Sequence, residues 1–405
     1  MSEFTVEISR PGEFGALTSA TLELPATWAE YKDAMDRARI IDDHRFMYSV
    51  EVCDIKRSCL QPHIHDNMHL LELNLLAQRM ENYIKDELDV FEAMVKIETG
   101  RNGGESIPLP RLINLTFSTG NCHVAGGIKT DTGLGKFLYE NDFLSDEDAG
   151  AVEARNKAGR PVSDLFATFG KEHRTNEGGV FTAAGRYVEF DGAVNEVYIP
   201  GDMAYFDRSG APVVLEISKG FFNTPRRSNV TATLDLPARE DQISSAVDAV
   251  GAASLKEIGW RCAECLIPAA KELIDDAEDL EVVERFAKAL ENMQRHTLPS
   301  LYKAMFETVK PPDLEAATEL AAAVEDYTLD AETSGPEDYA REYLSRLKGG
   351  DERIDLSRLI NPYALGQQVM ALENAEWTSY GVLKRKDGDP ILSQAGQPGM
   401  AMEMR

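Results

Sequence analysis

The feature that most constrains the fold of this 405-residue chain is an internal repeat. The sequence TLELPA at 21–26 recurs as TLDLPA at 233–238, which is 212 residues further along the chain. Self-similarity at a fixed period indicates repeated structural units, so we predict two tandem copies of one module of about 200 residues. Later matches follow in the same order, with an offset that shrinks as loop deletions would make it shrink: Cys53 with Cys265, Ala77 with Ala287, Pro110 with Pro312, Gly170 with Gly366, Phe181 with Trp377, and Gly185 with Gly381.

Each copy is predicted to begin with a strand, a helix and a second strand. Thr27 and Glu30 have the spacing of a capping box, so a helix should begin at 28 and end near 39. Alternation of polar and apolar residues, bounded by turn residues, predicts the strands, over 17–24 and 46–55 in the first copy and over 230–236 and 258–267 in the second.

The middle of each copy has helical periodicity. Shorter helices are predicted over 131–141 and 336–347, and strand-rich turns over 178–182 and 377–381. The fold class is therefore α+β: an elongated chain of small mixed subdomains, with short antiparallel sheets and helical bundles, duplicated in tandem. The apolar positions that recur at intervals of three or four residues are Leu73, Ala77, Met80 and Ile84 in the first copy, and Leu280, Val283, Ala287 and Leu290 in the second.

The repeat also predicts the domain boundaries. Residues 1–200 form the first module, and 229–386 form a second, divergent module. Residues 201–228 are interpreted as a connecting segment with strands, because 213–217 is a continuous strand-like run. Residues 387–405, rich in glycine, proline, glutamine and methionine, are predicted to be a flexible tail.

The chain is strongly acidic, with 69 acidic and 42 basic side chains and a net charge of −27. The excess is evenly shared, because residues 1–200 contribute −13 and residues 201–405 contribute −14. Such a field repels nucleic acid and phosphate ligands and attracts basic proteins. A surface adapted to solubility or to salt is the alternative explanation of the same composition.

The sequence also predicts a cytoplasmic protein. It contains no apolar run of about 18 residues that could span a membrane. The N-terminal sequence MSEFTVEISR has neither the basic nor the apolar region of a secretory signal. An odd count of five cysteines fits a reducing compartment better than a disulfide framework.

His63, His65 and His69, with Asp66 among them, form the best candidate for a metal site. Their spacing is similar to that of zinc ligands in metallohydrolases, but the usual order His-x-His-x-Asp-His is broken. The second copy has no histidines at the matching positions. We therefore expect no metal and no cofactor, and we keep a metalloenzyme that uses these three histidines as an alternative.

Two further motifs do not support catalysis. Cys262 and Cys265 form a C-x-x-C inside a predicted strand, without the second pair that a zinc site needs, so they are interpreted as core residues. The run 133–136 is similar to a P-loop, but Thr130 replaces its first glycine and Phe137 replaces the magnesium-binding hydroxyl residue. We therefore expect that the chain is not an enzyme.

The carboxylates themselves are the candidate functional residues. They occur in clusters with few bases between them, whereas a solvated helix face usually alternates in sign. The functional interpretation is a surface that presents negative charge at intervals, and plain solvation is the alternative. The candidates are Asp86, Glu87, Asp89, Glu92, Glu140, Asp142, Asp146, Glu147 and Asp148 in the first copy, and Asp275, Asp276, Glu278, Asp279, Glu284, Asp313, Glu315, Glu319, Glu325, Asp326, Glu337 and Asp338 in the second.

The first copy resembles the ArdA-type antirestriction proteins of bacterial conjugative elements and phages. The resemblance covers residues 21–200 and rests on LELNLLA at 71–77, FEA at 91–93, LINL at 112–115, LGKFL at 134–138, and Gly170 followed by Phe181, Thr182 and Gly185. The second copy retains the pattern more loosely over 233–385. The chain departs from the family in its duplication, because typical members have one copy.

The resemblance implies a DNA mimic whose carboxylates imitate duplex phosphates. Members of the family bind the DNA groove of type I restriction–modification enzymes in the bacterial cytoplasm and block them stoichiometrically. The partners implied are therefore basic DNA-binding proteins, with no direct binding of nucleic acid and no membrane. Leu134, Gly135, Phe137 and Leu138 match the family's antirestriction and dimerisation segment, which implies a homodimer or a pseudo-dimer within one chain. An acidic interaction module of a mobile element, with a target other than a restriction enzyme, is the second hypothesis.

Overall fold

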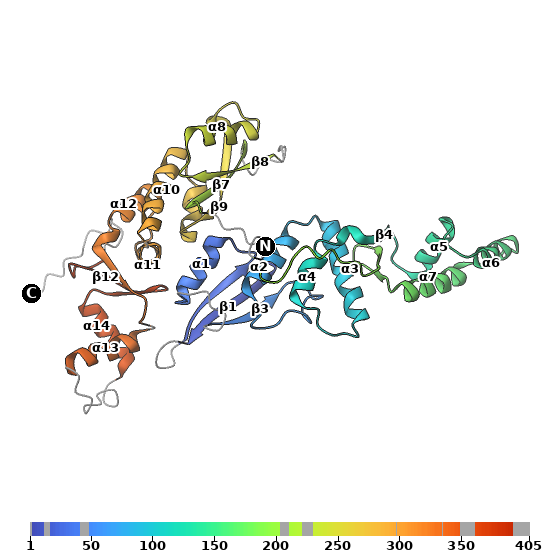
Figure 1. The fold of residues 1–405 in the computed structure, drawn as a ribbon, viewed down its shortest axis with the longest axis horizontal. Coiled ribbons are helices and arrows are strands. Elements are labelled where there is room, and N and C mark those ends of the chain that lie inside the picture. The colour runs from blue at the N-terminus through green and yellow to red at the C-terminus, as the bar shows by residue number, and fades with distance from the viewer. Residues whose placement is uncertain are drawn as a thin grey trace, which may run out of the picture. The chain divides into compact units, whose positions relative to one another are not determined.

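The computed structural model describes residues 2–11, 17–40, 48–202, 210–220, 230–296, 298–333, 335–348 and 361–391. Across these residues the chain forms fourteen α-helices and four short, three-stranded antiparallel sheets, which confirms the α+β class (Figure 1). The backbone groups into two compact units. The first unit comprises Met1–Val6, Glu23–Pro25 and Val50–Phe206, and the second comprises Glu7–Leu22, Ala26–Ser49 and Asp207–Arg405.

The N-terminal sheet has the strand order β2-β1-β3. Its strands are β1 (Phe4–Pro11), β2 (Leu17–Leu24) and β3 (Ser49–Ile55). The strand predicted over 17–24 is confirmed, and the strand predicted over 46–55 is confirmed from Ser49 onward, since 46 and 47 lie outside the described residues. Strand β1 was not predicted, although Phe4, Val6 and Ile8 alternate with polar residues and are buried.

Helix α1 (Trp28–Arg37) begins at the predicted capping box. The Thr27 hydroxyl accepts a hydrogen bond from the Glu30 amide at 3.2 Å, and the Glu30 carboxylate accepts one from the Thr27 amide at 2.8 Å. These two bonds satisfy donors that the first helical turn leaves open. The predicted helix over 28–39 is therefore confirmed, with its end two residues early.

Three helices form the middle of the first unit: α2 (Leu70–Glu81), α3 (Lys85–Arg101) and α4 (Leu109–Leu115). Leu73, Ala77 and Met80 are buried in α2, as their spacing predicts. The prediction that Ile84 continues this buried helical face is wrong, because Ile84 lies outside α2 and is 66% exposed. The Glu87 carboxylate accepts the Ile84 amide proton and begins α3 there, which interrupts the expected periodicity.

The last part of the first unit is a small sheet with three helices. The sheet has the order β4-β6-β5 and consists of β4 (Cys122–Gly126), β5 (Val180–Phe181) and β6 (Arg186–Phe190). Helix α5 (Asp131–Glu140) confirms the helix predicted over 131–141. The helices α6 (Asp146–Lys157) and α7 (Ser163–Glu177) complete this part.

The first sheet of the second unit has the order β8-β7-β9. Its strands are β7 (Val213–Lys219), β8 (Thr231–Leu236) and β9 (Ile258–Cys265), and helix α8 (Glu240–Ala249) follows β8. The strand-like run 213–217 forms most of β7. This strand is central, because it pairs with β8 on one edge and with β9 on the other, and Val213, Leu215 and Ile217 are completely buried.

The remaining elements of the second unit follow in a row of helices and a final sheet. Val283, Ala287 and Leu290 are buried in α10, as their periodicity predicts. The final sheet has the order β10-β12-β11, and residues 392–405 of the predicted tail lie outside the described residues. The elements are α9 (Lys271–Asp275), α10 (Leu280–Arg295), α11 (Pro299–Val309), α12 (Leu314–Ala322), β10 (Tyr327–Asp330), α13 (Pro336–Lys348), α14 (Pro362–Leu372), β11 (Glu376–Thr378) and β12 (Gly381–Arg385).

Two glycines allow equivalent close contacts in the two units. A Cβ atom on Gly170 of α7 would lie 1.9 Å from the carbonyl oxygen of Asp131, the first residue of α5. A Cβ atom on Gly366 of α14 would lie 1.8 Å from the carbonyl oxygen of Pro336, the first residue of α13. Only a residue without a side chain permits these helix pairs to approach so closely.

Candidate functional site

The candidate carboxylates fall into three groups in the structure. Members of the first group form ion pairs with nearby cations, so part of their charge is already compensated. Arg186, for example, lies 2.5 Å from Asp86 and Arg57 lies 2.7 Å from Glu92. The group comprises Asp86, Asp89, Glu92, Glu140, Glu284, Glu315 and Asp338.

Members of the second group bind backbone amides or, in one case, an N-cap hydroxyl. Asp279 and Asp313 are N-caps whose carboxylates accept amide protons of α10 and α12 at 2.9 and 2.8 Å. The Asp148 carboxylate instead accepts a hydrogen bond from the hydroxyl of Ser145, the N-cap residue of α6, at 2.7 Å, whereas the Glu87 carboxylate accepts the Ile84 amide proton at the start of α3. The Asp275 carboxylate accepts the amide proton of Cys262 at 2.5 Å. These five carboxylates stabilise helix starts or a strand, so they hold the fold as well as carrying charge.

The third group is exposed and forms no ion pair with any other described residue. A carboxylate in water with no adjacent cation keeps its full charge available to a partner. The carboxylates of this group therefore remain candidates for an interface with a partner. It comprises Asp142, Asp146 and Glu147 in the first unit, and Asp276, Glu278, Glu319, Glu325, Asp326 and Glu337 in the second.

A buried charged cluster in the second unit was not found from the sequence. The Lys303 side chain on α11 is 3% exposed, and its ammonium group lies 3.1 Å from Asp33 and 2.8 Å from Asp36, both on α1. The Tyr380 hydroxyl donates a hydrogen bond to Asp33 at 2.8 Å. Burial raises the pKa of the Tyr380 phenol, and the Asp33 charge raises it further.

This cluster has the geometry of a structural contact. Two carboxylates compensate the charge of Lys303, as in a buried ion pair that holds two elements together. A cavity of about 360 Å³ lies beside it and is lined mainly by apolar residues such as Ile267, Leu273 and Phe306. The signal in the sequence is a lysine within the otherwise apolar run LYKAMF at 301–306.

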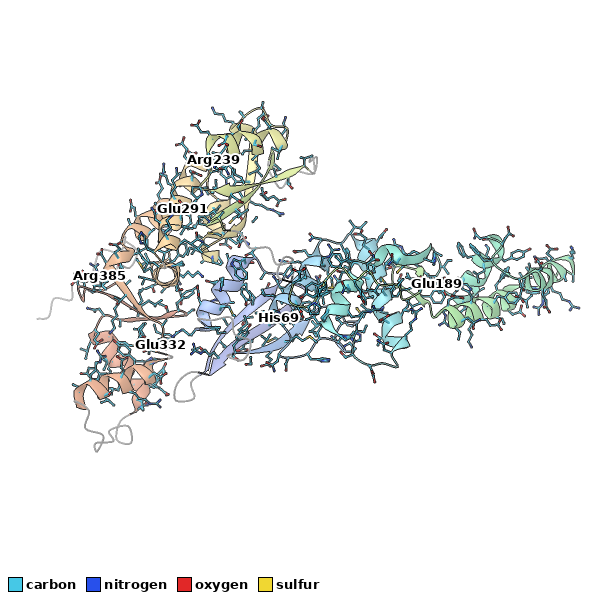
Figure 2. The ribbon with its side chains drawn as sticks, viewed as in Figure 1. His69, Glu189, Arg239, Glu291, Glu332 and Arg385 are labelled. Atoms are coloured by element: carbon cyan, nitrogen blue, oxygen red, sulfur yellow. The ribbon has the colours of Figure 1, made fainter. Side chains whose placement is uncertain are left out.

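The three histidines do not converge on one point. His63 is completely buried, and both of its ring nitrogens are engaged. Its Nδ1 accepts the amide proton of Ile107 at 3.1 Å, so its Nε2 donates to the Thr99 hydroxyl at 2.9 Å. His65 contacts the Ser106 hydroxyl at 3.1 Å, and His69 precedes α2 (Figure 2). Among the described residues, no group of three or more histidine, cysteine or acidic side chains is arranged to hold a metal.

Both cysteines of the C-x-x-C are buried, with exposures of 6% for Cys262 and 1% for Cys265. Strict alternation along β9 would place them on opposite faces, but an irregularity in the pairing with β7 between Val214 and Leu215 shifts the register. The hydrogen bond with Cys265 and burial together raise the pKa of the Cys262 thiol. A buried thiol with a raised pKa is a poor nucleophile, which favours the packing role.

Most residues of the predicted dimerisation segment pack against neighbouring elements of their own subdomain. Leu134 and Leu138 are 1% and 4% exposed and pack with Ile128 and Tyr187. A Cβ atom on Gly135 would lie 1.9 Å from the backbone oxygen of Phe166 on α7. Phe137 is half-buried. Three of the four residues therefore face neighbouring elements of the same chain.

Comparison with protein-family models, with curated proteins and with solved structures finds no match for this chain. Among the described residues, no helix is both long enough and apolar enough to cross a lipid bilayer.

Proposed function

We propose that this chain is a DNA mimic that occupies the DNA-binding groove of a basic enzyme, and that type I restriction–modification enzymes of a bacterial cytoplasm are its targets. The observation that carries the proposal is that nine carboxylates of the predicted acidic clusters are exposed and form no ion pair with any described residue: Asp142, Asp146, Glu147, Asp276, Glu278, Glu319, Glu325, Asp326 and Glu337. We name them the free-carboxylate set.

The magnitude of the charge is suited to this function. Duplex DNA carries one negative charge per about 1.7 Å of its axis, so a net charge of −27 corresponds to about 46 Å of duplex. That length is an upper bound, because it assumes that all of the net charge lies along one axis. Binding would release counterions from the basic groove of the enzyme and should weaken steeply as salt is added.

We also infer that the two halves arose by tandem duplication. The sheet orders β2-β1-β3 and β8-β7-β9 are equivalent, and so are β4-β6-β5 and β10-β12-β11. Sequences in equivalent helices agree as well, with FEAMVK at 91–96 in α3 and YKAMFE at 302–307 in α11. The close contacts at Gly170 and Gly366 are a third point of agreement. A duplicated module would double the length over which carboxylates can be presented.

The decisive experiment is competition for DNA. Purified protein is added to a type I methyltransferase bound to a labelled duplex that carries its recognition site, and displacement is followed at low and at physiological salt. We expect complete displacement at a fixed molar ratio, with a midpoint that rises with salt. No displacement at low salt, tested on several such enzymes, would contradict the proposal.

Charge reversal separates the arrangement of the carboxylates from total charge. Asp276, Glu278, Glu319 and Glu325 changed to Lys should weaken displacement strongly, because all four belong to the free-carboxylate set. The control reverses Glu105, Glu172, Glu177 and Glu196, which are also exposed and form no ion pair with a described residue but lie outside the predicted acidic clusters, so the net charge changes by the same amount. Equal loss in both variants would mean that total charge alone acts, which is the solubility explanation of the composition.

A further inference from the structure

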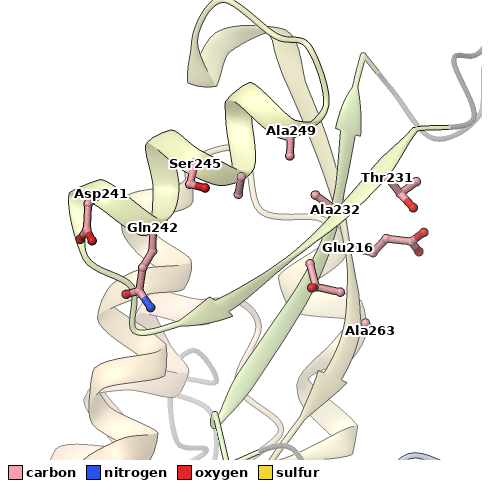
Figure 3. Close-up of a pocket in the computed structure, with 10 residues that line it drawn as sticks. Glu216, Thr231, Ala232, Asp241, Gln242, Ser245, Ala249 and Ala263 are labelled. Atoms are coloured by element: carbon pink, nitrogen blue, oxygen red, sulfur yellow. The ribbon is translucent and has the colours of Figure 1, made fainter.

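An open groove runs beside the outer edge of strand β8 in the second unit (Figure 3). It has a volume of about 740 Å³, and three successive residues of β8 line it: Thr231, Ala232 and Thr233. Successive side chains of a strand point to opposite faces of the sheet. A groove that contacts all three therefore passes round the edge of the strand, and it also extends to Glu216 on β7 and Ala263 on β9. We name it the β8 groove.

The edge of β8 that borders this groove has no partner strand among the described residues. In the order β8-β7-β9, β8 pairs on one side only, with β7, from Thr231 opposite Ser218 to Leu236 opposite Val213. An unpaired edge presents backbone amide and carbonyl groups that can bind another strand. Proteins commonly block such edges with lysine, proline or a bulge, and the β8 sequence TATLDL has no lysine or proline and pairs with β7 without a bulge.

Helix α8 forms the opposite wall of the β8 groove with small and polar side chains. Gln242, Ser245, Ala246 and Ala249 line it and lie at helical spacing along one face. Side chains this short leave room for a polypeptide backbone between the helix and the strand edge. β8 has six residues, so a segment bound along it would be about 20 Å long.

The net charge of the chain, −27, favours a basic occupant of the groove. Its two charged lining residues are Glu216 and Asp241. Each is paired with an exposed arginine: Arg261 at 2.5 Å, with its side chain 61% exposed, and Arg239 at 3.0 Å, with its side chain 73% exposed. The arginines compensate the two carboxylates, but exposed ion pairs contribute little to stability, so either pair can open and the carboxylate can bind a basic side chain of a partner instead. A second copy of this chain would instead bring a further net charge of −27 and the same two carboxylates, so repulsion opposes it.

We propose that the β8 groove binds an extended segment of a basic partner protein, which adds to the sheet as a further strand. Its backbone bonds to the free edge of β8, and its Lys or Arg side chains reach Glu216 and Asp241. This docking site does not depend on DNA mimicry, since it uses backbone hydrogen bonds and a different set of carboxylates.

The test uses the full-length protein and two labelled ten-residue peptides, with binding measured by fluorescence anisotropy at physiological salt. The first peptide alternates arginine with threonine and valine. The second has the same sequence with four consecutive central amides N-methylated, which keeps the charge and removes the hydrogen bonds. We expect saturable binding of the first peptide and binding at least about tenfold weaker for the second.

Two matched variants locate the binding site. Ser245→Trp fills the groove and should weaken binding of the first peptide at least about tenfold, whereas Ser244→Trp, on a neighbouring exposed position outside the groove, should change it less than about twofold. Absence of saturable binding, equal binding of both peptides, or equal effects of both variants would overturn the proposal. A dimer in sedimentation that Ser245→Trp disrupts would also overturn it, because a second copy would then occupy the groove.

Discussion

The Lys303 ammonium group donates to the Asp33 carboxylate across 3.1 Å, and the two residues are 270 positions apart in the chain. Asp33 also accepts hydrogen bonds from the Tyr380 hydroxyl at 2.8 Å and from Arg37 at 3.0 Å. One buried carboxylate thus joins α1 to two later parts of the second unit. This cluster, the glycine contacts, the buried histidine and the packing of α5 each give a measurable expectation.

Replacing Lys303 by Met should lower the free energy of unfolding by about 3–5 kcal/mol, because Asp33 and Asp36 then lose their buried cation. Urea denaturation of the purified variant would measure this loss. Lys288→Met is the control, because its pair with Glu284 places a 61% exposed lysine at the surface, where such pairs contribute about 0–1 kcal/mol. Equal stability of the two variants would contradict the burial argument.

Adding a methyl group at Gly170 or Gly366 should separate the helix pairs that these glycines bring together. We expect Gly170→Ala and Gly366→Ala each to cost about 1–3 kcal/mol or more, since each new Cβ would overlap a backbone carbonyl. Gly150→Ala, in α6 with no atom within 4 Å of the new Cβ, should instead stabilise the protein by about 0.5–1 kcal/mol. Thermal unfolding of the three variants provides the comparison, and losses of similar size in all three would refute it.

His63 should make stability depend on pH. Burial lowers its pKa below the usual value near 6.5, and the charge of His65 lowers it further. Since the pKa is lower in the folded state, the folded protein binds fewer protons than the unfolded chain. The contribution to stability is therefore complete above about pH 6.5 and is lost as the pH falls below that value toward the folded pKa.

The measurement is the urea midpoint at pH 7.5 and at pH 5.5. We expect His63→Gln to reduce the difference between the two midpoints relative to the unmodified protein. His123→Gln is the control, because His123 is exposed on β4 and should leave the difference unchanged. An unaltered pH dependence in His63→Gln would mean that this ring does not titrate as its burial requires.

Leu138→Ala tests whether the segment around Leu134 is core or interface. Leu138 is 4% exposed within its subdomain, so its truncation should cost about 2–5 kcal/mol of stability without changing the oligomeric state. The companion variant is Phe143→Ser, because the Phe143 side chain is 66% exposed. Calorimetry and sedimentation would report both quantities, and a stable Leu138→Ala that alters self-association would support the dimerisation role instead.

Local signals in the sequence predicted many of the elements. The capping box at Thr27, the alternation over 17–24 and the periodicity of Leu280, Val283, Ala287 and Leu290 each depend on neighbours within one element, so the chain itself contains the information. The position of a strand within its sheet depends on the tertiary environment, so local sequence does not predict it. The run 213–217 reads as a strand in any context, and only its pairing with β8 and β9 reveals that it is central.

The candidate site likewise combines features that local sequence predicts with features that depend on tertiary structure. Acidic clusters are visible in the sequence, but the difference between Asp279, which caps α10, and Glu278, which forms no ion pair with a described residue, depends on where each side chain points. The cation that pairs with Asp33 lies 270 residues away on α11, so no local pattern around Asp33 could identify it. The only sequence signal of this buried charge is a lysine among apolar residues at 301–306.

The membership of α1 in the second unit has a consequence for how the chain reaches its native state. Lys303 on α11 follows Asp36 by 267 residues and Tyr380 follows Asp33 by 347 residues, so α1 is synthesised long before these partners. Contacts of such long sequence separation slow folding, because the intervening chain must close a large loop first. A fragment that ends near residue 200 would leave the acidic face of α1 without its cation. The second unit therefore cannot complete its fold until the segment that contains α11 and Tyr380 has been synthesised.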